Sequence, residues 1–297
     1  MVLSESELEI WTHQGSVGLS SSTYDSVRNA LNVALNVANG KNFEVYLQGS
    51  YKNDTNIRGD SDVDIVIQLN STFQYDYLSM TEEEKGRFHQ VYKKDATYLW
   101  NDFRDDVLKS LRNHYDVSSV TEGNKSIKIA GNSSRLNADV LVCLQYRKYQ
   151  SFNTTENEKY VEGIVFYTKN GNFREISFPK RHYENGLNKN KVTNGFYKPT
   201  VRMFKNIRGV LVDRSILQRE SVPSYFLECL LYNVPNSAFQ GSFQNIFVNA
   251  VNWLNQANLT GMVTQCEFSN IFGQSSDNWS EDSARHFIRS LINLWNG

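Results

Sequence analysis

The segment from Gly49 to Asp64 constrains this chain more than any other part of it. Gly49-Ser50 follows a short apolar run, and Asp62 and Asp64, separated by one apolar residue, lead directly into the apolar residues 65–67. Alternate side chains of a strand point to opposite faces, so Asp62 and Asp64 share one face while their apolar neighbours share the other. Two carboxylates this close repel each other unless a hard divalent cation keeps both ionised. The pattern predicts a magnesium site on a strand.

Gly49 and Ser50 suit a phosphate-binding turn at the end of the preceding predicted strand, residues 44–48. A glycine lets backbone N–H groups approach a phosphate, and the serine hydroxyl adds a donor. An Asp-x-Asp pair taken alone is more often a solvated turn or cap than a metal site. The order of the two features decides between these interpretations.

A strand that ends in Gly49-Ser50, followed after eleven residues by Asp-hydrophobic-Asp-hydrophobic from Asp62, resembles the signature of the DNA polymerase β-like nucleotidyltransferase superfamily. The resemblance implies an α+β fold with a polymerase β-like nucleotidyltransferase core, in which helices cover a mixed sheet. It also implies that both sequence features belong to one active site.

A single acidic residue, Asp139, interrupts the mostly apolar segment 137–144, which is predicted to be a central strand. A carboxylate buried in such a strand is destabilising unless it is paired or binds a metal. A structural salt bridge to Arg135 or Arg147 is one interpretation. The nucleotidyltransferase resemblance favours the other, in which Asp139 is the third carboxylate of a two-metal site.

With three carboxylates, Asp62 and Asp64 would hold one Mg²⁺ at the triphosphate and would share a second Mg²⁺ with Asp139, with Mn²⁺ as a substitute. The second ion would lower the pKa of a ribose hydroxyl and direct it at the α-phosphorus, so that pyrophosphate leaves. Asp139 is also a candidate proton acceptor.

Overall composition gives no excess of positive charge for holding a polyanion, because 31 basic residues face 32 acidic ones and the net charge is −1. Any nucleotide must therefore be bound by a local cluster. The sequence has no run of about 18 apolar residues and no basic leader, so neither a membrane span nor a signal peptide is expected and the protein is predicted to be cytoplasmic. The three cysteines lie far apart, which predicts buried thiols rather than disulfides or a zinc site.

One region, residues 180–208, is clearly basic, since Glu184 is its only acidic residue. Within it, Arg202, Lys205 and Arg208 recur at three-residue spacing on a predicted helix that begins near Pro199. Such a stripe is usually a solvated face. Behind a phosphate-using core, a triphosphate clamp is an equally good interpretation.

A helix that carries Lys205, followed by Ser224-Tyr225 in the first turn of the next predicted helix, resembles the cyclic GMP-AMP synthase/DncV-like nucleotidyltransferases, or CD-NTases. In that family the lysine and serine contact the donor triphosphate and the tyrosine stacks on a nucleobase, roles that the resemblance assigns to Lys205, Ser224 and Tyr225. This chain lacks the clustered Cys/His zinc insertion of the animal DNA sensor, so zinc-dependent DNA sensing is not expected.

The resemblance implies a magnesium-dependent enzyme that joins ribonucleoside triphosphates into a cyclic oligonucleotide second messenger, with a cyclic dinucleotide expected, in bacterial antiphage signalling. The expected substrates are ATP together with GTP or a pyrimidine nucleotide. The protein is expected to be a monomer whose product acts on downstream effector proteins. The alternatives are a linear oligoadenylate synthetase, another polymerase β-like transferase acting on RNA, protein or a small molecule, and a binding module or antitoxin without turnover.

The predicted organisation is a catalytic lobe with N-terminal helices over residues 1–190 and a helical nucleotide-binding lobe over 191–297, with nucleotides in the cleft between them. Residues 185–194, rich in Asn, Gly and Lys, are predicted to form the connecting loop. The capping box at Thr81 is predicted to open a helical stretch that continues to Arg112.

Base selection is the property that the sequence constrains least. Polar candidates near the predicted hinge and at the end of the Asp139 strand are Gln145, Arg147, Asn188 and Asn194, most of which are expected to be surface or loop-capping groups. Amides can present a donor and an acceptor to adenine, whereas arginine suits guanine. Amides outnumber arginines in this set, so an adenine nucleotide is predicted in at least one of the two pockets.

Overall fold

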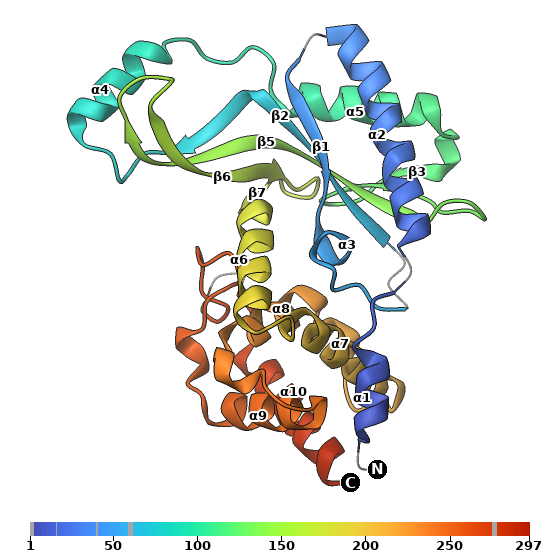
Figure 1. The fold of residues 1–297 in the computed structure, drawn as a ribbon. Coiled ribbons are helices and arrows are strands. Elements are labelled where there is room, and N and C mark those ends of the chain that lie inside the picture. The colour runs from blue at the N-terminus through green and yellow to red at the C-terminus, as the bar shows by residue number, and fades with distance from the viewer. Residues whose placement is uncertain (1–2, 16, 40, 59–61, 275–277) are drawn as a thin grey trace. The chain divides into compact units, whose positions relative to one another are not determined.

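The computed structural model describes residues 3–15, 17–39, 41–58, 62–274 and 278–297, without the side chains of 33–39. The chain divides into two compact units (Figure 1). The sheet unit contains Val17–Tyr51 and Ser61–Lys180, and the helical unit contains Met1–Ser16, Lys52–Asp60 and Arg181–Gly297. This division differs from the predicted one at residue 190, because the N-terminal segment and residues 52–60 group with the C-terminal part.

A seven-stranded mixed sheet forms the centre of the sheet unit in the described part of the chain. Strand β2 pairs in parallel with β5, and every other pairing is antiparallel. The order is β1-β2-β5-β4-β3, with β6 joining β5 to β7. The strands are β1 (Phe43–Leu47), β2 (Asp62–Asp76), β3 (Val120–Glu122), β4 (Ile127–Ile129), β5 (Asn137–Phe152), β6 (Glu158–Tyr167) and β7 (Arg174–Ser177). The α+β class is therefore confirmed.

Helices α2 (Gly18–Asn39) and α5 (Trp100–His114) lie side by side next to the sheet (Figure 1). The Ser110 hydroxyl of α5 donates to the Ala30 carbonyl of α2 at 3.1 Å. Beneath them, Val63, Ile65 and Ile67 of β2 are fully buried, as their alternation predicted. The face of β2 that carries the aspartates is thus the opposite one.

The predicted helical stretch from Thr81 to Arg112 is wrong as a single element. Its capping box is confirmed, but α4 (Glu82–Val91) ends at Tyr92, whose backbone leaves the helical region. Tyr92 packs against an aromatic cluster that contains Phe88 and Phe152. Packing of this partly buried ring against the cluster ends the helix, and α5 begins separately at Trp100.

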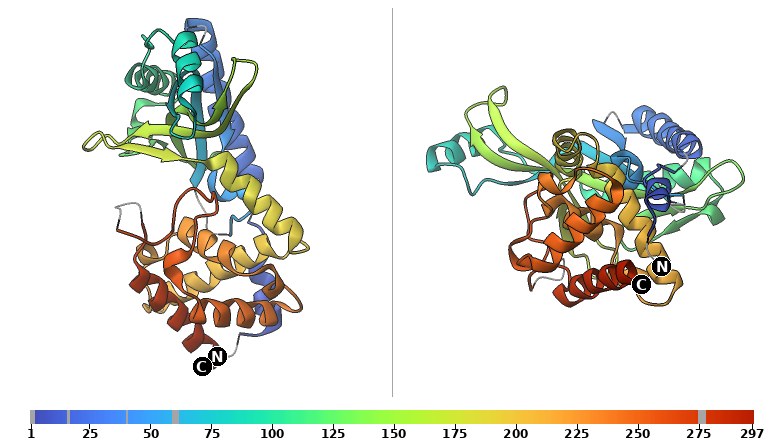
Figure 2. Two further views of the ribbon diagram at one scale, coloured as in Figure 1. Left: turned by 90° about the vertical axis from the view of Figure 1, so that its left-hand side faces the viewer. Right: turned by 60° about the horizontal axis from the view of Figure 1, so that its bottom comes forward.

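The helical unit is built around one apolar core, to which α1 contributes Leu8 and α7 contributes Val201, Phe204 and Leu211, all buried as predicted for α7. Figure 2 shows the C-terminal helices gathered around this core. The helices are α1 (Glu5–Trp11), α6 (Pro179–Val192), α7 (Tyr197–Asp213), α8 (Ser224–Asn233), α9 (Phe243–Gln256) and α10 (Glu281–Asn296). Leu8 explains why the N-terminal helix groups with the C-terminal part.

The predicted loop at 185–194 is also wrong, since most of it lies within α6. The Asn185 side-chain amide donates to the Gln265 carbonyl at 2.7 Å, and the absent side chain of Gly186 makes room for Gln265, whose Nε2 would lie 2.4 Å from an added Cβ. Packing against a distant segment outweighs the loop-like composition.

Two further predictions concern thiols and membranes. Cys143, Cys229 and Cys266 are free and buried, as predicted. Among the described residues, no helix combines the length and apolar character required to span a bilayer.

Candidate active site

The three predicted carboxylates lie on the paired strands β2 and β5 of the sheet unit. In the parallel pairing of these strands, Asp64 lies directly beside Asp139, and Asp62 lies beside Asn137. Residues paired in this way project from the same face of a sheet. Asp62 is exposed and Asp64 and Asp139 are partly buried, while Val63 between the first two is fully buried. One sheet face therefore carries all three acids.

Gly49 lies against this acidic group at the start of the short helix α3 (Gly49–Asn53). Its φ is +65°, and a Cβ added to it would lie 2.0 Å from Asp64 Oδ2. The backbone N–H of Gln48 donates to the Asp64 carbonyl at 3.0 Å, which fixes the turn beside β2. Ser50 is the second residue of α3. The phosphate-binding turn predicted from Gly49-Ser50 thus adjoins a predicted metal ligand.

Two residues next to the acids were not predicted from the sequence. The Asn137 amide donates to Asp62 Oδ1 at 3.1 Å, and the Lys128 ammonium on β4 lies 3.6 Å from Asp139 Oδ1. Asn137 could have been found from strand alternation, because it is two residues before Asp139, whereas Lys128 meets Asp139 only through the pairing of β4 with β5. Lys128 takes the place of the arginine partners considered for Asp139: Arg135 donates to the Ala130 carbonyl and Arg147 pairs with Glu158.

The environment of Asp139 favours a cation. Burial raises the pKa of Asp139 and the nearby Asp62 carboxylate raises it further, while Lys128 lowers it without reversing the net increase. No three acidic, histidine or cysteine side chains among the described residues are already gathered at metal-binding distance. The donor set still fits Mg²⁺ chemically, because it consists of carboxylate oxygens on one sheet face. The negative charge of Asp139 is also only partly balanced by Lys128.

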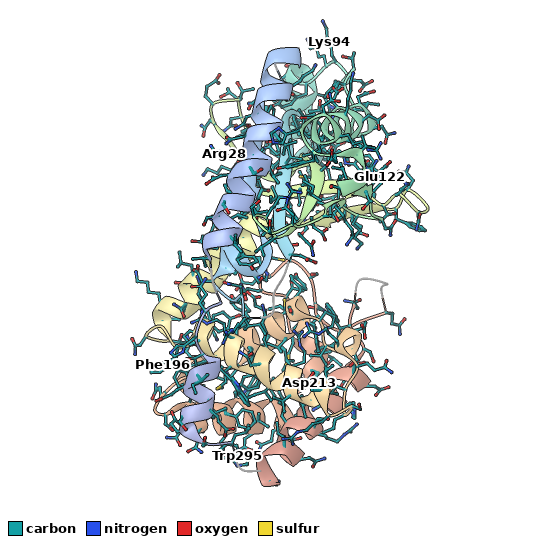
Figure 3. All side chains as sticks on the ribbon, turned by 90° about the vertical axis from the view of Figure 1, so that its right-hand side faces the viewer. Arg28, Lys94, Glu122, Phe196, Asp213 and Trp295 are labelled. Atoms are coloured by element: carbon teal, nitrogen blue, oxygen red, sulfur yellow. The ribbon has the colours of Figure 1, made fainter. Side chains whose placement is uncertain are left out.

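Lys205 lies in the helical unit, on α7 between the ends labelled Phe196 and Asp213 in Figure 3. It is only 1% exposed, and its ammonium donates to the Thr55 carbonyl at 2.8 Å. Of the two interpretations of the basic stripe, a solvated face does not hold, since Arg208 is also buried and donates to the Val222 carbonyl. A phosphate contact of Lys205 stays a prediction.

Ser224 and Tyr225 open α8. The N-cap is Pro223 and makes no side-chain cap, so the Ser224 hydroxyl is not the capping group; it accepts a hydrogen bond from Arg208 at 3.2 Å. Tyr225 is 45% exposed and stacks on the His182 ring, with 5.3 Å between centroids and 24° between planes. Tyr225 therefore presents an accessible aromatic ring, whereas Ser224 is tied to α7.

The base-selection candidates are largely structural. Arg147 donates to Gln145 at 2.8 Å and lies over the ring of Phe73 at 4.0 Å, so both polar groups belong to an internal network. Asn188 is exposed on α6, and Asn194 is exposed in a left-handed turn with φ of +52°. Both asparagines match the expected surface and turn roles.

A buried glutamate that the sequence did not indicate, Glu228 of α8, connects several of these groups. His182 Nε2 lies 3.4 Å from Glu228 Oε1, and the Thr55 hydroxyl donates to Oε2 at 3.3 Å. Burial raises the pKa of Glu228, but the hydrogen bond from His182 and the charge of Lys205 outweigh burial and lower it. Glu228 is therefore held as an anion.

Because the pKa of Glu228 is lower in the folded protein than in the unfolded chain, its anion stabilises the fold above the unfolded pKa. This contribution is lost as the pH falls through the lower folded pKa. Glu228→Gln should lower the free energy of unfolding by roughly 1–3 kcal/mol at neutral pH. Thermal unfolding followed by circular dichroism between about pH 7 and pH 3 should give curves for the two proteins that converge in acid.

Glu184→Gln provides the matched control, because Glu184 is exposed on α6 of the same unit. The unfolding temperature of this variant should change with pH as that of the wild-type protein does. If the unfolding temperature of Glu228→Gln stays below that of wild type by the same amount throughout the acid range, this carboxylate does not titrate with unfolding.

The comparisons with known proteins agree with this arrangement. Residues 34–161 match the nucleotidyltransferase domain, and residues 184–296 match the cGAS/DncV-like nucleotidyltransferase C-terminal helical domain. The chain is 47% identical over 297 residues to the cyclic UMP-AMP synthase of Rhodothermus marinus (strain SG0.5JP17-172), covering 100% of this chain and 99% of that protein. It is 38% identical over 301 residues to the cyclic nucleotide synthase CdnE01 of Staphylococcus haemolyticus, with the same coverage.

Structural similarity extends over the whole chain. The structure of Rhodothermus marinus CdnE c-UMP-AMP synthase with Apcpp and Upnpp superimposes with a TM-score of 0.90 at 45% identity, covering 99% of this chain and 97% of that one. Identity at this level across the full length shows common membership rather than a shared fold alone. The chain therefore belongs to the cGAS/DncV-like nucleotidyltransferases, the CD-NTases, and is a nucleotidyltransferase.

Proposed function

We propose that this enzyme joins ATP and UTP into a cyclic dinucleotide second messenger and releases one pyrophosphate for each bond formed. The observation that carries the chemistry is the register of Asp64 beside Asp139, with Asp62 on the same sheet face. The choice of ATP and UTP is supported by the 47% identical relative, which is a cyclic UMP-AMP synthase.

In each step a ribose hydroxyl oxygen would bond to the α-phosphorus of a triphosphate as the bond to the β-phosphate oxygen breaks. The hydroxyl proton would pass to a base, for which Asp139 is the candidate because it lies beside Asp64 on the same sheet face. Mg²⁺ bound by Asp62, Asp64 and Asp139 would supply Lewis-acid chemistry for this displacement. Gly49 and Ser50 would donate backbone N–H groups to the phosphates, since N–H groups in a first helical turn lack intrahelical partners.

Substrate identity needs a direct test, because the relatives make different products. A 35% identical relative from Elizabethkingia meningoseptica is a cyclic dipurine nucleotide synthase, and a 32% identical one from Legionella pneumophila is a cyclic dipyrimidine nucleotide synthase. The sequence-based prediction of an adenine pocket agrees with the proposed pair.

Incubation with all four ribonucleoside triphosphates and Mg²⁺, and with each one omitted in turn, should identify the substrates by chromatography and mass spectrometry. We expect a phosphatase-resistant product that contains AMP and UMP, and we expect its formation to fail when ATP or UTP is omitted. Chelation of the metal should stop synthesis, and Mn²⁺ should restore it.

Other products would change the proposal in defined ways. Full activity without ATP would reject the adenine pocket, while a phosphatase-sensitive ladder from ATP alone would identify a linear oligoadenylate synthetase. If a cyclic product forms, we further propose that it acts in antiphage signalling through effector proteins that bind it.

A further inference from the structure

The Tyr225 ring is held on two sides and open on a third. Its hydroxyl interacts with the side chains of Cys229 and Thr264, and burial of that hydroxyl raises the pKa of Tyr225. One ring face stacks on His182, yet 45% of the residue remains exposed. Because the hydroxyl and one ring face are already in contact with other side chains, the second ring face is the one left for another ring. A planar partner can stack only there.

The orientation of the Tyr225 ring depends on His182, which lies on α6 and is 7% exposed. Among the described residues, His182 Nδ1 has no hydrogen-bond partner, while Nε2 lies 3.4 Å from Glu228 Oε1. The imidazole plane is thus set by one polar contact and one stacking contact. If Glu228 moves, the imidazole loses its polar anchor.

Glu228 is well suited to be that anchor. It lies three residues after Tyr225 in α8, so the two side chains emerge on the same side of the helix. The residue is 4% exposed, and its carboxylate also accepts hydrogen bonds from Asn53 and Thr55, each at 3.3 Å. Its backbone carbonyl accepts from the Tyr197 hydroxyl at 3.1 Å. These contacts leave the carboxylate little freedom to rotate.

We propose that His182 and Glu228 are positioning residues that hold the Tyr225 ring in one plane, so that its exposed face can stack on a nucleobase. The proposal rests on the proposed function, in which Tyr225 meets the base of a bound nucleotide. Stacking is strongest when two rings lie parallel and offset, and a ring that must first be ordered binds more weakly. His182 therefore contributes to base affinity without touching the nucleotide.

The test separates base binding from phosphate binding. Dissociation constants for Apcpp, which carries a base, and for inorganic tripolyphosphate, which does not, would be measured by calorimetry with Mg²⁺. We expect Tyr225→Ala to weaken Apcpp roughly tenfold and His182→Ala roughly fivefold, with tripolyphosphate changed by less than about twofold in both. In the double variant, the His182 substitution should add little, because its effect passes through Tyr225.

Conservative variants and a matched control distinguish a specific loss of base binding from a general loss of folding. His182→Phe keeps the stacking face but loses the polar contact with Glu228, so it should recover only part of the Apcpp affinity. Glu228→Gln should weaken Apcpp and leave tripolyphosphate binding unchanged. His286→Ala makes the same chemical change on α10, where His286 is exposed, and should match wild type. Unfolding temperatures of all variants would be recorded alongside.

Two results would overturn the proposal: an equal loss of tripolyphosphate affinity in His182→Ala, or an undiminished His182 effect in the Tyr225→Ala background. Failure of the proposed function would look different. In that case the wild-type protein would bind Apcpp no better than tripolyphosphate and would form no nucleotide product, whatever residue stands at position 182.

Discussion

Asp64→Asn is expected to lower product formation by at least about 1,000-fold, because a neutral amide is a poor ligand for a hard cation. Asp64 is the member of the acidic group that lies beside Asp139 and against Gly49. The substitution changes the shape of the side chain very little and removes a repulsion between neighbouring carboxylates. The unfolding temperature should therefore stay the same or rise. Product quantified by chromatography and a thermal melt measure the two effects.

Asp116→Asn is the matched control, since Asp116 is exposed in the same unit and makes no side-chain cap at the turn that it precedes. This variant should retain wild-type synthesis. Asp62→Asn and Asp139→Asn should lose synthesis as Asp64→Asn does. Retained product formation in either β2 variant would remove these aspartates from the active site.

The acidic site could be predicted from the sequence because it depends on local geometry. Strand alternation alone places Asp62 and Asp64 on one face, and the apolar segment around Asp139 marks a buried strand. The pairing of β2 with β5 has a different origin, since residues some 75 positions apart meet only when the sheet assembles. The family resemblance supplied that step, and the register that puts Asp64 beside Asp139 comes from the structure.

The charges of the helical unit could not be predicted in this way. Lys205 and Arg208 have the spacing of a solvated stripe, but α7 buries them against backbone carbonyls. The residues that accept these hydrogen bonds, Thr55 and Val222, lie outside α7 and give no signal in its periodicity. For the same reason Glu228 and His182 were not predicted as functional residues, because the side chains that they contact lie far away in the sequence.

The predicted helix boundaries are wrong where tertiary packing opposes the local composition of the chain. Residues 185–192 have the Asn, Gly and Lys content of a loop, yet α6 continues through them because Asn185 and Gly186 fit against Gln265. The opposite happened after α4, where a helical composition was interrupted because Tyr92 is drawn into an aromatic cluster. In both places tertiary packing outweighs several weak propensities.

Gly49→Ala is expected to reduce synthesis by about 100-fold, although it adds only one methyl group. The added Cβ would lie 2.0 Å from Asp64 Oδ2 and 2.9 Å from Asp64 Cγ, so the carboxylate must move away from its place beside Asp139. The φ of +65° adds strain of roughly 1–2 kcal/mol for a residue with a Cβ. Steady-state synthesis and the unfolding temperature would be measured on the same preparation.

Gly86→Ala separates the two consequences of this substitution. Gly86 lies inside α4 of the same unit, and an added Cβ meets no atom within 4 Å, so alanine should stabilise the helix by about 0.5–1 kcal/mol and leave synthesis unchanged. In Gly49→Ala the loss of synthesis should exceed what the small loss of stability can explain, since at working temperature most molecules remain folded. An active Gly49→Ala enzyme would mean that Asp64 can leave its observed position without cost to the reaction. The close contact between Gly49 and Asp64 would then have no catalytic importance.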